Sequence, residues 1–488
     1  MRRLAVATVL TAALLASAVA APAADFGAND DTGKYETDYG TKLYGDMAGL
    51  GLRQIVLTTR FRPSDPLTIQ DRGYLDRTIP AAVAAGLRVV LTTYPYPPRE
   101  IESGLATPAG FGAYVATVAR AYPEVRQFVI GNEPNQPAFW RPQFAADGSN
   151  ASAPAFGPFL AAGYDALKAV DPAIEVIGVG LSPRGNDRPD AKSNVSTSPV
   201  RFIRALGAWY RSSGRSQPLM DGFSFHPYPN RATDPLDRGY SWPNAGFVNL
   251  DRIKQALWDA FRGTAQPTTV EGLKLHLDEV GWQVDTSRLA GYTGLENVVV
   301  TDENTQAAIY AELVRRAACD PDIADVSFFG FRDDAERTGF QAALQRLDGT
   351  GRPAAEAVRA AIADDESGCR GTPVAWQPAT TVLDPSASLV RAGAGWSKEL
   401  RVRAGEDVQA NVCISATRPT SGFLRVSERI VGVSCRSVAL AGLRTRDVPV
   451  VTPFGAPVDL SVELVAASNP ARRTTVVMRG VRGASHRA

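Results

Sequence analysis

The sequence predicts an α/β protein that consists of a (β/α)8 barrel followed by a small all-β sandwich. Between about residues 26 and 363, short apolar runs alternate with longer amphipathic stretches, which is typical of a parallel sheet covered by helices. The alternation repeats eight times over roughly 340 residues, as expected for a closed barrel with long loops. Beyond residue 371, β-rich runs follow one another with Gly, Pro and Asp turns and no long helix.

The predicted barrel strands are short runs rich in Val, Ile, Leu and Phe, bounded by polar or turn residues. In chain order they are Asp25–Ala28, Arg53–Thr58, Arg88–Thr92, Gln127–Ile130, Glu175–Val179, Gly222–His226, Lys274–Glu279 and Asp325–Phe331.

The predicted helices carry apolar residues at spacings of three and four, which place them on one face. The last helix begins with Pro353, a residue favoured in a first helical turn. In chain order the helices are Lys42–Ala48, Leu75–Ala85, Phe111–Ala121, Phe156–Val170, Val200–Tyr210, Leu250–Phe261, Thr305–Ala318 and Pro353–Ala363.

A doubly wound sheet would show the same alternation, but it needs a glycine-rich turn that binds phosphate. The nearest segment is Gly178-Val179-Gly180, and Pro183 stands where the last glycine of that motif belongs. The barrel is therefore favoured.

The chain of 488 residues is long enough for two domains, which we expect at residues 25–370 and 371–488. A net charge of +1 with 21% charged residues gives no indication of nucleic acid as a partner. The predicted strands of the second domain are Glu399–Val402, Val408–Ser415, Gly422–Ser427, Val431–Val438, Val448–Val451 and Val458–Val465. This module could bind carbohydrate or a cell surface, or brace the barrel.

Residues 1–24 have the pattern of a secretory signal peptide. Arg2 and Arg3 precede the apolar run Leu4–Ala16. Ala18-Val19-Ala20 is a small-residue cleavage site, and Ala21-Pro22-Ala23 is a second candidate. A membrane anchor is less favoured because the apolar run is short and consists largely of Ala. We expect a secreted, extracellular protein without stable membrane insertion, and a monomer.

Four cysteines suit an exported protein and allow three pairings. Cys319–Cys369 with Cys413–Cys435 keeps each disulfide inside one predicted domain. Zinc binding is the competing interpretation, but there is no Cys-x-x-Cys spacing and the chain has only three His. We expect no metal and no cofactor.

Two glutamates follow apolar strands and are the strongest functional signal. Glu133 lies in Gly131-Asn-Glu-Pro-Asn, and Glu279 lies in Leu277-Asp-Glu-Val-Gly-Trp. Enzymes with this barrel place their chemistry at the carboxyl ends of the strands. Two carboxyl groups brought to that rim can cleave a glycosidic bond, one as acid and one as nucleophile.

These motifs resemble glycoside hydrolase clan A, whose retaining enzymes include families 5 and 39. The resemblance covers residues ~26–365 and implies that Glu133 is the acid/base on strand 4 and Glu279 the nucleophile on strand 7. It also implies that Asn132 binds the hydroxyl beside the anomeric carbon. His226 and Tyr228 match the clan's His and Tyr on strand 6, with the Tyr hydroxyl bonding the nucleophile.

Strands 7 and 8 carry the remaining points of resemblance. Trp282 follows Glu279 at the clan's usual offset, and the resemblance implies that it contacts the substrate. On strand 8 the clan has a Trp as the floor of the sugar subsite, and Phe331 is the nearest match here. On strand 2 the clan's Arg falls on Val56, and we expect Arg60 to replace it.

Strand parity predicts which side chains of strand 7 face inward. Leu275, Leu277 and Glu279 share parity, so we expect the two leucines inside the barrel and Glu279 at its mouth, with Asp278 toward the helices. Neighbouring Asn132 and Glu133 would point to opposite faces, so strand 4 must twist or bulge at its end.

Aromatic residues on the loops after the strands are candidates for stacking on sugars, or else simply pack in the core. They are Tyr94, Tyr96, Phe139, Trp140 and Trp242. Trp140 and Trp242 are favoured as substrate contacts because they are expected at one rim.

The expected function is a secreted retaining glycoside hydrolase that acts on a carbohydrate substrate. Retention requires carboxyl groups about 5–5.5 Å apart, whereas wider spacing gives inversion. A carbohydrate-binding barrel without activity is the main alternative, although it would normally have lost one Glu. A transglycosidase would use the same two residues.

Overall fold

The computed structural model describes residues 24–240, 243–365, 369, 376–378 and seven strands between residues 386 and 481. The predicted signal peptide, apart from Ala24, lies outside these residues. The chain divides into two compact units, residues 1–376 and 377–488.

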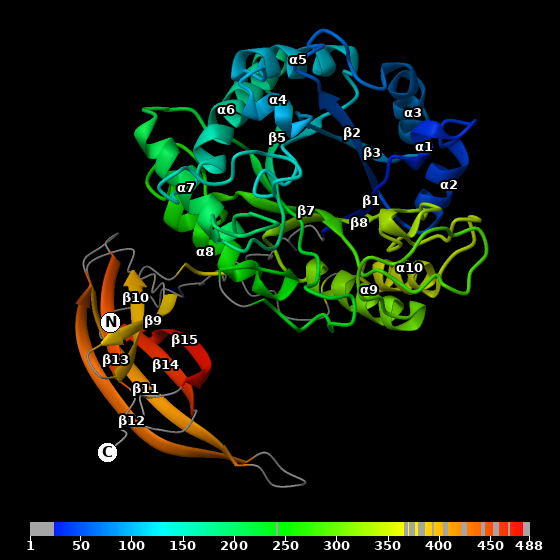
Figure 1. Ribbon diagram of the computed structural model, residues 1–488. Coiled ribbons are helices and arrows are strands. Elements are labelled where there is room, and N and C mark those ends of the chain that lie inside the picture. The colour runs from blue at the N-terminus through cyan, green and yellow to red at the C-terminus, as the bar shows by residue number, and fades with distance from the viewer. Residues whose placement is uncertain are drawn as a thin grey trace, which may run out of the picture. The chain divides into compact units, whose positions relative to one another are not determined.

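The first unit is a closed barrel of eight parallel strands in sequential order, so the predicted (β/α)8 barrel is confirmed (Figure 1). The strands are β1 (Asp25–Asn29), β2 (Gln54–Phe61), β3 (Arg88–Pro95), β4 (Gln127–Ile130), β5 (Glu175–Leu181), β6 (Gly222–Phe225), β7 (Lys274–Val280) and β8 (Ile323–Phe329). All eight coincide with predicted strands to within a few residues at each end.

Eight helices lie outside the strands (Figure 1). They are α2 (Thr41–Gly49), α3 (Arg72–Ala84), α5 (Pro108–Ala121), α6 (Ser152–Val170), α7 (Pro199–Ser212), α8 (Leu250–Phe261), α9 (Glu303–Ala318) and α10 (Pro353–Asp365). Two short helices that the sequence did not predict lie on loops, α1 (Thr32–Tyr35) and α4 (Pro98–Glu102), and three single 3-10 turns occupy Phe247–Asn249, Thr269–Glu271 and Arg337–Gly339.

The main hydrophobic core lies between the barrel and its helices and includes outward-facing strand residues such as Leu57, Leu91 and Phe128. A second, small apolar cluster fills one side of the barrel interior with Val56, Val90, Val129 and Ile177. These four residues come from β2 to β5, one from each strand. The other side of the interior is polar, which is unusual for a barrel core and requires that its groups be paired.

The polar side of the interior centres on His276 of β7. Its Nδ1 lies 2.7 Å from Asp325 Oδ2, and its Nε2 lies 3.3 Å from Glu175 Oε1. Burial lowers the pKa of His276, but Asp325 and Glu175 outweigh it and raise that pKa to about 10. The contact with His276 lowers the pKa of Glu175 to about 2. A charged imidazole between two carboxylates therefore closes this side of the barrel.

A disulfide joins Cys319, at the end of α9, to Cys369, beyond α10. This confirms the first predicted pair. Strand register places Cys413 opposite Cys435, but their side chains lie outside the described residues, so the second pair stays a prediction.

The second unit contains two antiparallel sheets. One has the order β13-β10-β9 and the other β12-β11-β14-β15. The strands are β9 (Ser386–Ala392), β10 (Gly395–Arg403), β11 (Val408–Thr420), β12 (Ser427–Leu440), β13 (Thr445–Val451), β14 (Val458–Ala466) and β15 (Asn469–Val481). The sequence predicted neither β9 nor β15, and the predicted strand at Gly422–Ser427 lies outside the described residues apart from Ser427, where β12 begins. A sandwich of these sheets stays a prediction.

Across the part of the chain that the structure describes, no helix is both long enough and apolar enough to cross a lipid bilayer.

Candidate active site

Glu133 is placed by a sharp backbone turn just after β4. Gly131 has φ +117°, a conformation that favours glycine, and a Cβ there would approach Val179 O to 2.5 Å. Glu133 itself has φ +43°, and its N–H donates to Gly180 O at 2.7 Å. The expected irregularity at the end of strand 4 is thus confirmed, and it leaves the Glu133 side chain 17% exposed.

The parity prediction for β7 was wrong. Leu275 and Leu277 belong to the core between barrel and helices, whereas His276 and Asp278 face the interior. Between Leu277 and Val280 the register with β8 shifts, so β7 has one residue more than its partner. This bulge turns both Asp278 and Glu279 inward.

One imidazole connects the acidic side chains. His226, which follows β6 and is almost fully buried, has its Nδ1 3.3 Å from Glu133 Oε1 and 3.4 Å from Glu279 Oε2. These two distances limit the separation of the two carboxyl oxygens to their sum, 6.7 Å. The His226 Nε2 lies 3.4 Å from Asp278 Oδ1, so Asp278 supports the imidazole from below.

Two neutral donors contact the Glu279 carboxylate. The Tyr228 hydroxyl donates to Oε2 at 3.0 Å, as the resemblance implied. Asn29, at the end of β1, donates its Nδ2 to Oε1 at 3.4 Å and to Asp278 O at 3.1 Å. Sequence reasoning missed Asn29, although its position directly after the predicted strand Asp25–Ala28 was a usable signal.

The electrostatics follow from burial and from three neighbouring carboxylates. Burial raises the pKa of Glu279 to about 7, with the charges of Glu133 and Asp278 adding to the rise and His226 and Tyr228 opposing it. Burial also lowers the pKa of His226, but Glu279 and Asp278 outweigh it and hold that pKa well above its usual value. The imidazole is therefore positively charged at neutral pH.

Glu133 and Glu279 open into a cavity of about 1270 Å³ at the carboxyl ends of the strands. This is large for a small-molecule site. Asn132 lines the cavity beside Glu133, as expected. The charged lining residues differ between its two ends. Acidic residues Asp30, Asp31, Glu36 and Asp334 follow β1 and β8, whereas Arg184 and Arg231 follow β5 and β6.

Trp140 and Trp282 were wrongly predicted as substrate contacts. Trp140 is 2% exposed and packs edge-on against Phe156 and Phe159 in the core, while its neighbour Phe139 lines the cavity. Trp282 is equally buried, and its Nε1 donates to Asp234 O at 2.9 Å. Both rings stabilise loops behind the cavity wall.

Phe331 was also wrongly predicted, because it is fully buried beyond the strand end. Its N–H donates to Asp30 Oδ2 at 2.7 Å. Phe329 and Phe340 line the cavity instead and contact each other and Tyr228 edge-on. The aromatic floor expected at this strand is thus formed two residues earlier.

Arg60 lines the cavity as predicted. Its Nε donates to the Tyr94 hydroxyl at 3.0 Å, and its guanidinium lies over the Tyr96 ring. Val56, by contrast, lies in the barrel interior. Trp242 lies outside the described residues.

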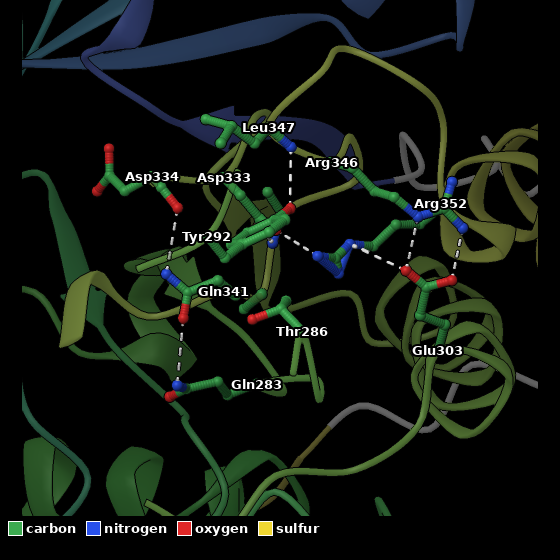
Figure 2. Close-up of polar contacts among 12 residues, drawn as sticks. Gln283, Thr286, Tyr292, Glu303, Asp333, Asp334, Gln341, Arg346, Leu347 and Arg352 are labelled. Carbon is green, nitrogen blue, oxygen red and sulfur yellow. Dashed lines mark hydrogen bonds and ion pairs between the residues drawn. The ribbon is translucent and has the colours of Figure 1, made fainter. Parts of the chain in front are cut away.

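A polar network supports the acidic end of the cavity (Figure 2). Gln341 accepts from Gln283 Nε2 at 3.5 Å and donates to Asp334 O at 3.3 Å, and both partners line the cavity. Nearby, buried Asp333 accepts from the Tyr292 hydroxyl at 2.7 Å and pairs with Arg352. The network joins the long loop after β7 to the loop after β8.

No protein-family model matches the chain. A search of curated proteins gives no match either.

Solved structures that match the chain include glycoside hydrolases of families 5 and 39, the families that the motifs resemble. A family 39 glycoside hydrolase from Bacteroides cellulosilyticus WH2 is 16% identical, with 88% of this chain and 81% of that chain covered and a TM-score of 0.46. GH5_18 from Streptomyces cattleya, in complex with GlcNAc, is 16% identical, with 74% of this chain and 83% of that chain covered and a TM-score of 0.48. An exo-beta-1,4-mannosidase from Opitutaceae bacterium strain TAV5 is 16% identical, with 71% of this chain and 60% of that chain covered and a TM-score of 0.45. Similarity at this level carries no argument about function, which has to rest on the geometry of the site.

Proposed function

We propose that the protein is a retaining glycoside hydrolase that cleaves O-glycosidic bonds of a carbohydrate substrate by double displacement. Glu133 is the acid/base and Glu279 the nucleophile. The observation that carries this proposal is the contact of both carboxylates with one nitrogen of His226 on the floor of a large cavity.

The first displacement uses one proton and one negative charge. Glu279 attacks the anomeric carbon while Glu133 protonates the glycosidic oxygen, so the C–O bond breaks and the alcohol leaves. Tyr228 and Asn29 donate to Glu279, which favours its charged, nucleophilic form. The charge on His226 adds to this effect.

The second displacement regenerates the enzyme. Glu133, now deprotonated, takes a proton from water as the water attacks the anomeric carbon and releases Glu279. The oxygens of the two carboxylates are at most 6.7 Å apart, the sum of their distances to His226. This separation supports retention rather than inversion, for which the carboxyl groups are about 6.5–9.5 Å apart.

Glu279→Gly tests the assignment of the nucleophile. We expect it to abolish hydrolysis of an activated nitrophenyl glycoside, identified in a screen of different sugars. Added azide should restore turnover and give a glycosyl azide of inverted configuration. Glu312→Gly, on the outer surface of α9, is the control and should retain activity. Normal hydrolysis by Glu279→Gly would refute the proposal.

Two further points belong to this proposal. Product analysis with and without an added alcohol acceptor separates hydrolysis from glycosyl transfer. We also propose that the protein is secreted, which the N-terminal pattern and the disulfide support. Mass spectrometry of protein from the culture medium should show the chain beginning at Ala21 or Ala24.

A further inference from the structure

Four arginines line the cavity, and among the residues that the structure describes only Arg332 has a counter-ion, whereas Arg60, Arg184 and Arg231 have none. Arg184 and Arg231 are both exposed and line its wall after β5 and β6. Neither forms an ion pair with any residue that the structure describes. Arg184 makes only long contacts with Asn230, at 3.4 Å to the carbonyl and 3.5 Å to the side chain.

The other arginines of the cavity have partners, which makes the difference informative. Arg332 forms an ion pair with Glu36 and contacts Gln345, and Arg60 donates to the Tyr94 hydroxyl. Arg188, on the same loop as Arg184 but outside the cavity lining, pairs with Asp190 at 3.6 Å.

The wall around the two arginines lacks opposing charge. Its other lining residues after β5 and β6 are neutral: Ser182, Pro183, Asn194, Pro229, Asn230, Ala232 and Tyr240. The acidic lining residues, apart from the catalytic pair, follow β1 and β8. In the sequential barrel β1 lies opposite β5, and β8 is separated from β6 by β7. The two ends of the cavity therefore carry opposite charge.

The basic end lies on the side of the acid/base. Glu133 follows β4, the neighbour of β5. Tyr240, which also lines this wall, is affected by both groups: after burial, the charge of Arg184 lowers its pKa, and the charges of Asp234 and then Glu133 raise it. Because an acid protonates the leaving oxygen, the leaving group must lie next to Glu133.

We propose that Arg184 and Arg231 bind an anionic group, a carboxylate or a sulfate, on the leaving group of the substrate. This inference rests on the proposed function and names its substrate class: glycosides with a negatively charged aglycone. Guanidinium groups bind both anions through paired N–H donors.

A matched pair of fluorogenic substrates tests the inference. The 3-carboxyumbelliferyl and 4-methylumbelliferyl glycosides of the same sugar differ in the charge of the leaving group. We define the preference as the ratio of their kcat/KM values, and we compare it between the wild-type protein and Arg184→Gln, Arg231→Gln and the double variant. Intrinsic differences in leaving ability cancel in this comparison.

We expect the preference for the anionic substrate to fall about ten-fold in the double variant, with kcat/KM for the neutral substrate nearly unchanged. Raising the salt concentration should weaken the wild-type preference, because exposed charges are screened. Arg188→Gln is the matched control and should leave the preference unchanged. An unchanged preference in the double variant, with both substrates hydrolysed, overturns the inference and leaves the proposed function standing.

A binding measurement separates the two proposals. Free 3-carboxyumbelliferone is titrated into the full-length wild-type protein and the double variant at pH 6, with 4-methylumbelliferone as the neutral comparison. Tighter binding of the anion that is lost in the double variant supports the arginine site, even if no glycoside is hydrolysed. Equal binding of the anion by both proteins refutes it.

Discussion

At the scale of single residues, the site depends on the charge of Glu279. Glu133 and Glu279 contact the same nitrogen of His226. Burial and the neighbouring carboxylates raise the pKa of Glu279 to about 7. The proposed reaction needs the charged form of Glu279, because the carboxylate is the form that attacks the anomeric carbon.

The raised pKa predicts the acid side of the pH profile. Below about pH 7 the Glu279 carboxyl is increasingly protonated and cannot attack, so kcat/KM should fall as the pH decreases from 7 to 5. Initial rates on a nitrophenyl glycoside between pH 5 and 9 measure this. A kcat/KM that stays constant from pH 7 down to pH 5 would contradict the raised pKa of Glu279.

Tyr228→Phe should lower kcat by about 10- to 100-fold, because the substitution removes a hydrogen bond to a charged group. The same donor favours the charged form of Glu279, so its loss should raise the pKa of Glu279 and move the acid limb of the profile to higher pH. Tyr122→Phe, whose hydroxyl contacts Asp76 outside the cavity, is the control. A lower kcat without a shift of that limb would mean that the Tyr228 hydroxyl does not affect the protonation of Glu279.

At the scale of elements, the barrel could be predicted because apolar residues in the strands and major helices recur at the spacing typical of each kind of element. The ends of the strands could not be predicted in the same way. Strand parity predicted that the Asp278 side chain faces the helices. One extra residue in β7 between Leu277 and Val280 turns this side chain into the barrel interior instead. Nothing in Leu277-Asp-Glu-Val marks a bulge, since the register depends on the partner strand β8.

The aromatic contacts failed for a related reason. Trp140 and Phe331 are adjacent or near to residues that do line the cavity, Phe139 and Phe329. In a loop, tertiary packing decides whether a side chain faces the core or the solvent. The alternating pattern of a strand does not predict this outcome. The structure brings together Glu133, Glu279, His226 and Tyr228. These residues were identified by resemblance to known motifs and not by periodicity.

The polar interior at the other end of the strands predicts a pH-dependent stability. The folded-state pKa of His276 is raised from 6.5 to about 10, so its contribution is complete below about pH 6.5 and is lost as pH rises through 10. Glu175, whose pKa is lowered to about 2, contributes above about pH 4.5 and loses its contribution in acid. Between these limits both groups stabilise the fold.

His276→Gln should cost about 3–5 kcal/mol of unfolding free energy at pH 6, since it leaves buried Asp325 without its charged partner. The difference from wild type should shrink at pH 10, where the native imidazole is partly neutral. Denaturant unfolding at both values measures it. Glu312→Gln, which breaks an exposed pair with Arg316, should cost under about 1 kcal/mol. A pH-independent difference for His276→Gln would exclude a role for its charge.

At the scale of the whole molecule, the disulfide closes the barrel's last two helices into one loop. Cys319 and Cys369 are separated by 50 residues, so reducing them releases about 4 kcal/mol of loop-closure entropy to the unfolded chain. Cys319→Ser with Cys369→Ser should lower the unfolding free energy by up to that amount while retaining glycosidase activity, because neither residue lines the cavity. A large loss of activity at a temperature where the variant is folded would contradict this separation.

The residues that line the described cavity all belong to the compact unit of residues 1–376. The role of the C-terminal sheets in binding carbohydrate, a surface or the barrel can be measured by comparing a chain that ends at Trp376 with the full chain on soluble and insoluble glycans.

The extra residue in β7 makes the choice of nucleophile sensitive to chain length. Removing one residue between Leu277 and Val280 would remove this irregularity, leave the opposite one between Leu275 and His276 uncompensated, and leave room for only one of the two adjacent acids to point inward. If that were Asp278, the attacking oxygen would sit one methylene farther from the sugar, out of reach of Tyr228 and Asn29. Deleting one residue at this point of β7 could thus abolish the proposed catalysis, even though all other candidate site residues remained in the sequence.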